Sequence, residues 1–111
     1  DGDQTRDYVF VEDIVRGNLL AVAMSAGSEM PIVNLGTGRE SSVNRLAAAL
    51  QEIAGRPIDA RHAPAKTGEQ RRSALDASLA KRRLGWEPRI DLRSGLARTF
   101  AWFAERANAG R

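Results

Sequence analysis

The chain has 111 residues, 42% of them hydrophobic and 28% charged, a composition typical of an ordinary globular domain. It contains no cysteine, which excludes disulfides and cysteine-bound metals and fits the cytosol, and no apolar run approaches the roughly 20 residues that span a bilayer. Seventeen Lys and Arg against fourteen Asp and Glu leave a net charge of +3, which suits an anionic ligand but is too small to choose between a nucleic acid and a nucleotide.

The first part of the chain predicts a strand, a helix and a second strand. Residues 8–11 form a short β-prone run. Asp13 is then placed to cap a helix that continues to about Ser25 and stops at Gly27. This helix is apolar nearly all round, so it needs covering on several sides, and a chain of this length supplies few covering layers. Residues 31–35 predict the second strand.

After a glycine turn at residues 36–38, the sequence predicts an amphipathic helix. Ser41 or Ser42 is placed to cap its N-terminus, and Gly55 and Pro57 end it. The apolar stripe of this helix consists of Val43, Leu46, Ala47, Leu50 and Ile53.

The last part predicts a third strand, a loop and two more helices. The strand covers residues 58–63, and the loop runs from 64 to about 72. Asp76 is placed to cap a short helix that ends at Gly85, and Asp91 to cap the last helix. The expected inner face of the last helix consists of Leu92, Leu96, Phe100 and Phe103. Strands alternating with helices predict an α/β fold.

Few residues lie in a catalytic pattern. The turn at 36–38 lacks the third glycine of a dinucleotide fingerprint, so a plain strand-to-helix turn is favoured. Tyr8 lacks the lysine four residues later that a catalytic dehydrogenase tyrosine needs, so a packed aromatic is favoured. His62 has no partner at metal-ligand spacing. Residues 4–8 and 64–69 contain basic groups suited to a phosphate, although each stretch predicts an exposed ion pair equally well.

Five landmarks in order extend over nearly the whole chain and carry a family resemblance. They are the opening DGDQTRDYVFVED, then NLGTG at 34–38, KTGE at 66–69, DAS at 76–78 and LGWEP at 84–88, with GL at 95–96 and Trp102 after them. Together they resemble the C-terminal part of extended short-chain dehydrogenases, above all UDP-glucose 4-epimerases of the NAD-dependent epimerase/dehydratase family. Because the chain also begins without methionine or a signal segment, we expect it to be part of a longer protein.

The resemblance implies an α/β fragment of a Rossmann-type enzyme. Residues 1–40 would cross from the substrate domain into the Rossmann unit, contributing its late helix and strand. Residues 41–111 would form most of the sugar-nucleotide-binding C-terminal domain. The N-terminal domain that binds NAD, with the Ser/Thr residue and the Tyr-x-x-x-Lys pair, would lie outside the chain. No catalytic, NAD-binding or metal-binding residue is therefore expected here, and the fragment alone is expected to be inactive.

The resemblance also implies four substrate-binding residues. Arg6 would contact the pyrophosphate of a nucleotide-diphosphate sugar, and Lys66 would be a second basic ligand where the family usually has arginine. Glu69 would bond the nucleotide ribose. Ser73, four residues later, would border the 2-substituent of the hexose, and its small side chain would admit an N-acetyl group; a polar loop residue is the competing interpretation. Structural roles fall to Asp7, Asp13 and Trp86.

Three functions stay open on the sequence. The leading one is the substrate-binding portion of a UDP-glucose/UDP-galactose 4-epimerase, with N-acetylated sugars as further substrates. The same portion of a nucleotide-sugar 4,6-dehydratase or UDP-glucuronate decarboxylase is the first alternative, and a non-catalytic anion-binding or interaction module is the second. The parent enzyme is expected to be a homodimer and to bind neither nucleic acid, whose common motifs are missing, nor a membrane.

Overall fold

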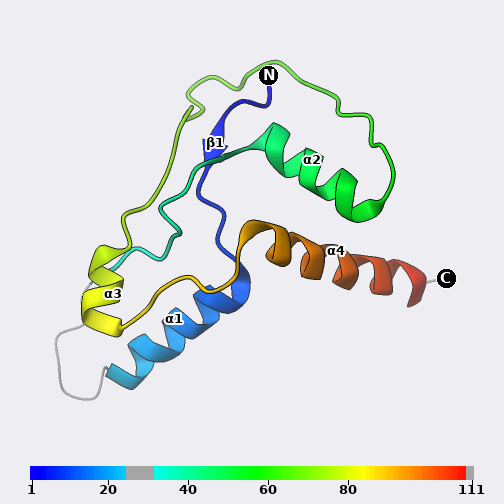
Figure 1. Cartoon of the computed structure of the whole chain (residues 1–111). Coiled ribbons are helices and arrows are strands. Elements are labelled where there is room, and N and C mark those ends of the chain that lie inside the picture. Colours follow the sequence, from blue (N-terminus) through cyan, green and yellow to red (C-terminus); the bar gives the residue numbers. More distant parts are fainter. Residues whose placement is uncertain (25–31, 110–111) are drawn as a thin grey trace.

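A computed structural model describes residues 1–24 and 32–109 of the chain, which form an open arrangement of helices (Figure 1). In chain order these are β1 (Thr5–Arg6), α1 (Val11–Met24), β2 (Ser41–Ser42), α2 (Val43–Ala54), α3 (Ser78–Leu84) and α4 (Leu92–Ala109). The radius of gyration is 17.1 Å, against about 13 Å for a compact domain of this length. The elements therefore enclose little interior. Within the described ranges, no helix is long and apolar enough to cross a membrane.

Helices α2 and α4 pack against each other, and their caps agree with the sequence prediction. The Ser42 hydroxyl accepts a hydrogen bond from the Arg45 amide at the start of α2. Gly55 ends α2 in the left-handed conformation, with a φ of 66°. Asp91 accepts from the Ser94 amide at the start of α4. These helices form one half of the molecule.

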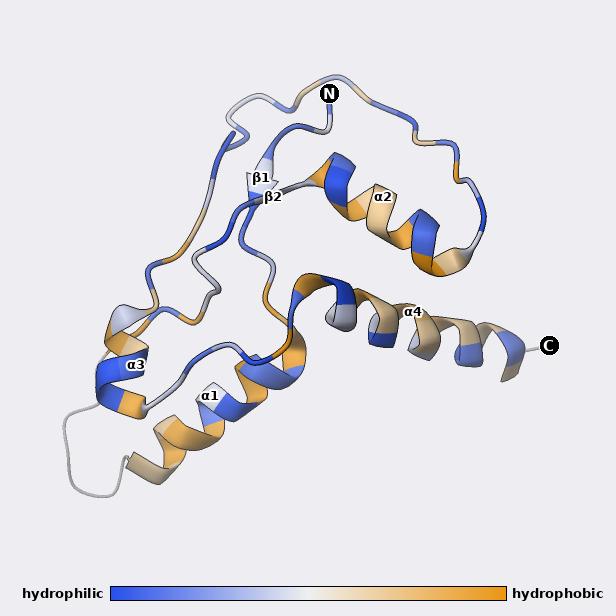
Figure 2. Ribbon diagram, viewed as in Figure 1, coloured by the Kyte–Doolittle hydropathy of each residue, from blue (hydrophilic) through white to orange (hydrophobic). Residues whose placement is uncertain are grey.

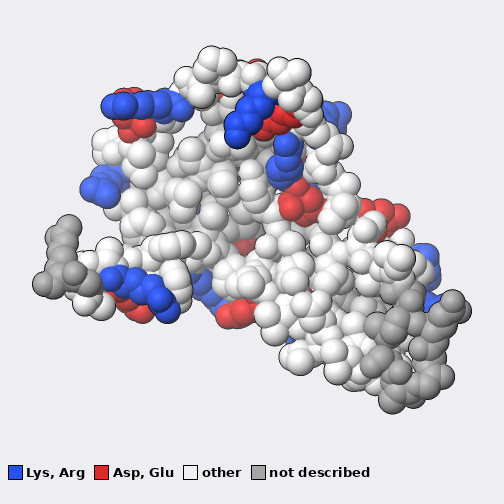
Figure 3. Space-filling model, turned by 180° about the vertical axis from the view of Figure 1, so that it is seen from behind, with Lys and Arg blue, Asp and Glu red and all other residues white. Residues whose placement is uncertain are grey.

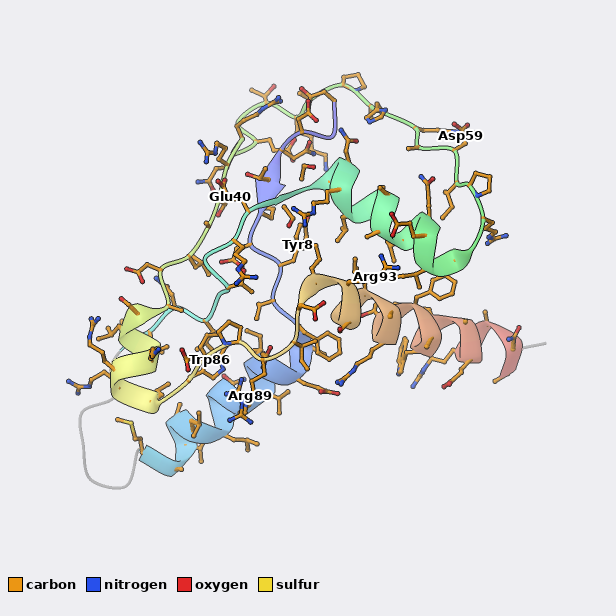
Figure 4. All side chains as sticks on the ribbon, viewed as in Figure 1. Tyr8, Glu40, Asp59, Trp86, Arg89 and Arg93 are labelled. Atoms are coloured by element: carbon orange, nitrogen blue, oxygen red, sulfur yellow. The ribbon has the colours of Figure 1, made fainter. Side chains whose placement is uncertain are left out.

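Helices α1 and α3 form the other half around Trp86, whose side chain is fully buried (Figure 4). Gly85 ends α3 in the left-handed conformation, as predicted, and turns the chain so that Trp86 enters the space between the two helices. The buried core comprises Ala80, Leu84 and Trp86, with Val9, Leu20, Ala21, Met24, Val33, Leu35 and Ala77 packed around it. The prediction that Trp86 is a packing anchor is confirmed.

Asp13 lies in the first turn of α1, and its role differs from the predicted one. The helix already begins at Val11, and the Asp13 amide donates to the Phe10 carbonyl, so Asp13 does not cap it. Its side chain is only 2% exposed and accepts from the amides of Arg89 and Ile90 at 2.9 and 3.0 Å. Asp13 is therefore a structural residue, as expected, but it joins α1 to the segment before α4.

The outer face of α1 is apolar and exposed (Figure 2). Four side chains at helical spacing, Val11, Val15, Leu19 and Val22, are 50–71% exposed. The opposite face carries Asp13 and Gly17, the buried residues of the helix. The sequence prediction that this helix needs more covering than the chain supplies agrees with the exposure. The predicted end of the helix at Ser25 and Gly27 lies outside the described residues.

The inner face predicted for α4 is only half correct. Leu92 and Leu96 are half-buried, whereas Phe100 and Phe103 are 36% and 62% exposed. Helix α4 extends past the end of α2 (Figure 1), so nothing in the described part of the chain covers its last turns. Helix α3 likewise begins two residues after Asp76, which accepts from the Ser78 amide at 2.8 Å instead of occupying the cap position.

The three predicted strands are wrong within the described residues. Residues 8–10 precede α1 in irregular conformation and residue 11 begins it, and residues 32–35 and 58–63 are also irregular, while Pro31 lies outside the described residues. A strand forms only where a neighbour accepts its ladder of hydrogen bonds. The one ladder described joins β1 to β2 antiparallel, with Thr5 opposite Ser42 and Arg6 opposite Ser41. The β-prone runs have no such neighbour among residues 1–24 and 32–109.

Candidate functional site

Arg6 and Glu69 lie together where the long connection from α2 to α3 passes β1 (Figure 1). The Thr5 amide donates to the Arg71 carbonyl at 2.9 Å, which fixes this connection along the strand. One terminal nitrogen of Arg6 donates to the carbonyls of Thr5 and Gln70, each at 2.7 Å. The other lies 3.7 Å from a Glu69 carboxylate oxygen, and both side chains are 34% exposed. A cation and a carboxylate thus stand side by side, both open to a ligand.

Lys66 belongs to the same loop, three residues before Glu69. Its carbonyl accepts from the Glu69 amide at 3.1 Å, and Gly68 adopts a φ of 80°, which makes a tight turn. The Lys66 side chain is exposed and has no ion-pair partner within residues 1–24 and 32–109. The turn therefore places a free ammonium group three residues from the carboxylate of Glu69.

Ser73 is half-buried at the point where the loop leaves β1. Its neighbour Arg72 donates to both carboxylate oxygens of Glu40, at 3.1 and 2.5 Å. Glu40 also accepts from the Thr5 hydroxyl at 2.6 Å. The hydrogen bonds from Arg72 and Thr5 lower the pKa of Glu40 to about 2, so its carboxylate is ionised throughout the physiological range. The sequence analysis did not single out Glu40, because its partners lie 35 and 32 residues away.

Asp7 joins the segment after β1 to the glycine turn and to the loop end. Its carboxylate accepts from the Thr37 amide and hydroxyl at 2.9 and 2.5 Å, from the Gly38 amide at 2.8 Å and from the Leu75 amide at 3.2 Å. Burial raises the pKa of Asp7, but these hydrogen bonds outweigh it and hold the pKa below its ordinary value. The structural role expected for Asp7 agrees with these contacts.

The glycine turn is unsuited to a dinucleotide phosphate because its amides are already used. The amides of Thr37 and Gly38 both donate to Asp7 instead of pointing into open space. A methyl group added at Gly36 would approach an Asp7 oxygen and the Leu75 Cβ to 2.7 Å. Gly36 is therefore required by close packing, which supports the interpretation of residues 36–38 as a plain turn.

Tyr8 is half-buried, as expected of a packed aromatic. Tyr8 points into the space between α2 and α4 (Figure 4), where it borders a cavity shared with Leu46, Leu92 and Leu96. His62 lies 3.2 Å from the Asn44 side-chain oxygen. In the described part of the chain, no three metal-ligating side chains gather at one point.

Charges on the surface are mixed in sign. On the face shown in Figure 3, basic side chains lie mostly beside acidic ones, without a continuous basic patch. Exposed ion pairs of this kind include Arg71 with Asp1, Arg93 with Glu52 and Arg98 with Glu12. Such pairs contribute about 0–1 kcal/mol each to stability.

The chain matches known proteins over most of its length. The family model described as GDP-mannose 4,6 dehydratase matches residues 1–99. The chain belongs to this family. Among curated relatives, the UDP-glucose 4-epimerase of Mycolicibacterium smegmatis is 37% identical over 107 residues, 96% of this chain and 34% of that protein. The dTDP-glucose 4,6-dehydratase of Actinoplanes sp. is 37% identical over 109 residues, 97% of this chain and 33% of that protein.

Solved structures of the same family share the fold. The UDP-glucose 4-epimerase of Thermotoga maritima, crystallised with UDP-glucose, superimposes with a TM-score of 0.87 at 43% identity and covers 96% of this chain. The Bifidobacterium longum enzyme, in complex with NAD+ and UDP, gives 0.89 at 30% identity and covers 97%. This chain covers 34% and 32% of those chains, so it spans about a third of the proteins it matches. These matches confirm the resemblance found in the sequence. The chain is the C-terminal part of an extended short-chain dehydrogenase/reductase of Rossmann type, similar to UDP-glucose 4-epimerases.

Proposed function

We propose that this chain is the nucleotide-sugar-binding portion of an NAD-dependent UDP-glucose/UDP-galactose 4-epimerase. The observation that carries the proposal is the juxtaposition of Arg6 and Glu69, two residues 63 positions apart, at one exposed point beside β1. A nucleotide-diphosphate sugar offers an anionic pyrophosphate next to ribose hydroxyls. A cation beside a carboxylate acceptor is complementary to that arrangement.

Each of the four candidate residues has a distinct part in the proposal. Arg6 binds the pyrophosphate with the guanidinium donors that it does not use on the carbonyls of Thr5 and Gln70. Glu69 accepts hydrogen bonds from the ribose hydroxyls in place of its 3.7 Å contact with Arg6. Lys66 adds a positive point charge without a bidentate fork. Ser73 borders the hexose.

The remaining two thirds of the enzyme supply NAD and the catalytic groups in this proposal. NAD bound there would supply hydride transfer to and from the sugar. The glycine turn described here does not fit the cofactor's phosphates, since the amides of Thr37 and Gly38 are occupied. Residues 1–40 contribute α1 to the Rossmann unit, and residues 41–111 form most of the substrate domain. The exposed apolar face of α1 supports this division, because it requires a covering surface.

The isolated 111 residues should neither bind NAD nor interconvert UDP-glucose and UDP-galactose. The reason is that both the NAD-binding groups and the proton-transferring groups lie in the other two thirds of the enzyme. Calorimetric titration with NAD and a turnover assay check this, with the intact enzyme as the positive control. Turnover by the purified fragment, free of contaminating enzyme, would show that the chemistry was assigned to the wrong part.

Ser73→Tyr should reduce kcat/KM for UDP-N-acetylglucosamine about tenfold or more and leave kcat/KM for UDP-glucose nearly unchanged in the intact enzyme. Ser73 is half-buried, and hydrogen bonds hold Arg72 before it and Leu75 after it. A larger side chain at this position therefore has little freedom to move aside. The added volume meets only the larger 2-substituent. An equal loss on both sugars, or none on either, would place Ser73 away from the hexose.

A nucleotide-sugar 4,6-dehydratase is the second candidate, and the relative from Actinoplanes favours it. Incubation of the intact enzyme with UDP-glucose and with dTDP-glucose separates the two. An epimerase yields the 4-epimer without loss of water, whereas a dehydratase releases water and forms a 4-keto-6-deoxy sugar.

A further inference from the structure

Glu40 joins the two segments that carry the candidate site, although it lies in neither of them. It stands immediately before β2 and points toward the loop side of β1 (Figure 4). One of its oxygens accepts from the Thr5 hydroxyl at 2.6 Å, and the carboxylate receives two hydrogen bonds from Arg72. Thr5 is the neighbour of Arg6, and Arg72 is the neighbour of Ser73.

From this geometry we propose that Glu40 is a positioning residue for the nucleotide-sugar site, acting through Thr5 and Arg72. The inference rests on the function proposed above. By holding both neighbours, Glu40 fixes the distance between the strand that presents Arg6 and the loop end that presents Ser73. Without this bridge, the loop is attached to β1 near the site by backbone hydrogen bonding at Thr5 and by Arg6 itself.

The bridge acts together with a second carboxylate farther along the loop. Asp7 accepts from the Leu75 amide, so the segment 72–75 is held at both ends, by Glu40 at one and Asp7 at the other. Ser73 lies between these two attachments. The two ends differ in what they fix. Asp7 also holds the glycine turn, whereas the hydrogen bonds that Glu40 accepts within the described residues come from Thr5 and Arg72. Substitution of Glu40 therefore loosens the site without releasing the turn.

A glutamate elsewhere in the chain provides a matched control. Glu52 on α2 forms a 2.5 Å ion pair with Arg93 on α4, also a glutamate–arginine contact between distant segments, and both side chains are more than 60% exposed. Glu52→Gln makes the same chemical change away from Arg6 and Ser73. It controls for the loss of one surface ion pair.

The test is steady-state kinetics of the intact enzyme with UDP-glucose. Glu40→Gln should raise KM about tenfold while kcat changes by less than about threefold, because small displacements of binding groups weaken binding without removing a catalytic group. Glu52→Gln should leave both parameters unchanged. Thr5→Val, which removes the hydroxyl, should raise KM, and Thr5→Ser, which keeps it, should not. The Thr5 pair gives an answer even if Glu40→Gln does not fold.

A double-mutant cycle tests whether Glu40 acts through Arg72. Arg72→Gln should raise KM about as much as Glu40→Gln, and the double variant should be no worse than either single one. Unchanged KM in Glu40→Gln and Thr5→Val, or fully additive effects in the cycle, would overturn the inference. If KM responds to Arg6→Ala but not to Glu40→Gln, only this inference fails. A wild-type enzyme that does not convert UDP-glucose contradicts the proposed function instead.

Discussion

Arg6→Ala should weaken UDP-glucose binding to the intact enzyme by about 2–4 kcal/mol, roughly 30- to 1000-fold in Kd, because a charge-assisted phosphate contact is lost. In the structure Arg6 also donates to the Gln70 carbonyl, so the substitution frees part of the loop. Arg6→Lys keeps the positive charge but lacks the guanidinium fork. It therefore separates the contribution of the charge from that of the bidentate hydrogen bonds. Calorimetric titration with UDP-glucose measures Kd for the wild type, Arg6→Ala and Arg6→Lys.

Lys66 and a distant arginine provide the comparisons for Arg6. Lys66→Ala should cost less than Arg6→Ala, and Lys66→Arg should tighten binding, because arginine restores bidentate contact with a phosphate. Arg98→Ala, which breaks an exposed ion pair with Glu12, should leave Kd unchanged. If Arg6→Ala and Arg98→Ala give the same Kd as the wild type, Arg6 is a surface residue and the phosphate assignment fails.

Asp13→Asn should destabilise the intact enzyme by about 3–5 kcal/mol, the cost of removing one partner from a buried charged network. The Asp13 carboxylate accepts from the amides of Arg89 and Ile90 and from Arg16. The amide group of asparagine turns a donor toward these donors, so at least one of them loses its acceptor. The main chain of Asp13 also accepts from the Trp86 indole nitrogen at 2.7 Å, which links the network to the core.

Denaturant unfolding measures this loss, with Glu12→Gln as the control one residue away. Glu12 is exposed and pairs with Arg98, so its substitution should change the free energy of unfolding by less than about 1 kcal/mol. An Asp13→Asn protein as stable as Glu12→Gln would show that the buried network contributes little.

The hydrogen bonds around Asp13 make the stability of the folded state depend on pH. Burial raises the pKa of Asp13, but hydrogen bonds from Ile90, Arg16 and Arg89 outweigh it and hold the pKa below its ordinary value of 3.8. A carboxyl whose pKa is lower in the folded state stabilises that state above pH 3.8 and loses the contribution as the pH falls through the folded-state pKa. Stability of the wild type should therefore fall below about pH 4 more steeply than that of Asp13→Asn.

Local signals in the sequence predicted the helices and several of their ends, although the predicted starts of α1 and α3 are wrong. Ser42 caps α2 through its own hydroxyl, and Gly55 and Gly85 end α2 and α3 in the left-handed conformation. These features depend on residues three or four positions apart, which the sequence displays directly. The prediction of the strands was wrong because a strand depends on a partner strand. The β-prone runs at 8–11 and 58–63 have no partner strand among the described residues.

Long-range contacts explain what the sequence missed in the candidate site. The family resemblance selected Arg6 and Glu69, and the structure brings them together. It gave no indication of Glu40, whose partners Thr5 and Arg72 lie far away in the chain. Asp13 was expected to cap its own helix, because an acidic residue before an apolar run is a capping signal. Its partners at 89–90 were not visible in the local pattern.

A crystal structure of the intact enzyme with NAD and UDP-glucose would locate the nucleotide-sugar site. We predict that the Arg6 guanidinium lies within hydrogen-bonding distance of the pyrophosphate, with Glu69 on the ribose hydroxyls and the hexose beside Ser73. The present contact of 3.7 Å between Arg6 and Glu69 would then be replaced by contacts with the ligand. A complex in which UDP-glucose binds elsewhere, with Arg6 still facing Glu69, would show that these residues do not form the substrate site.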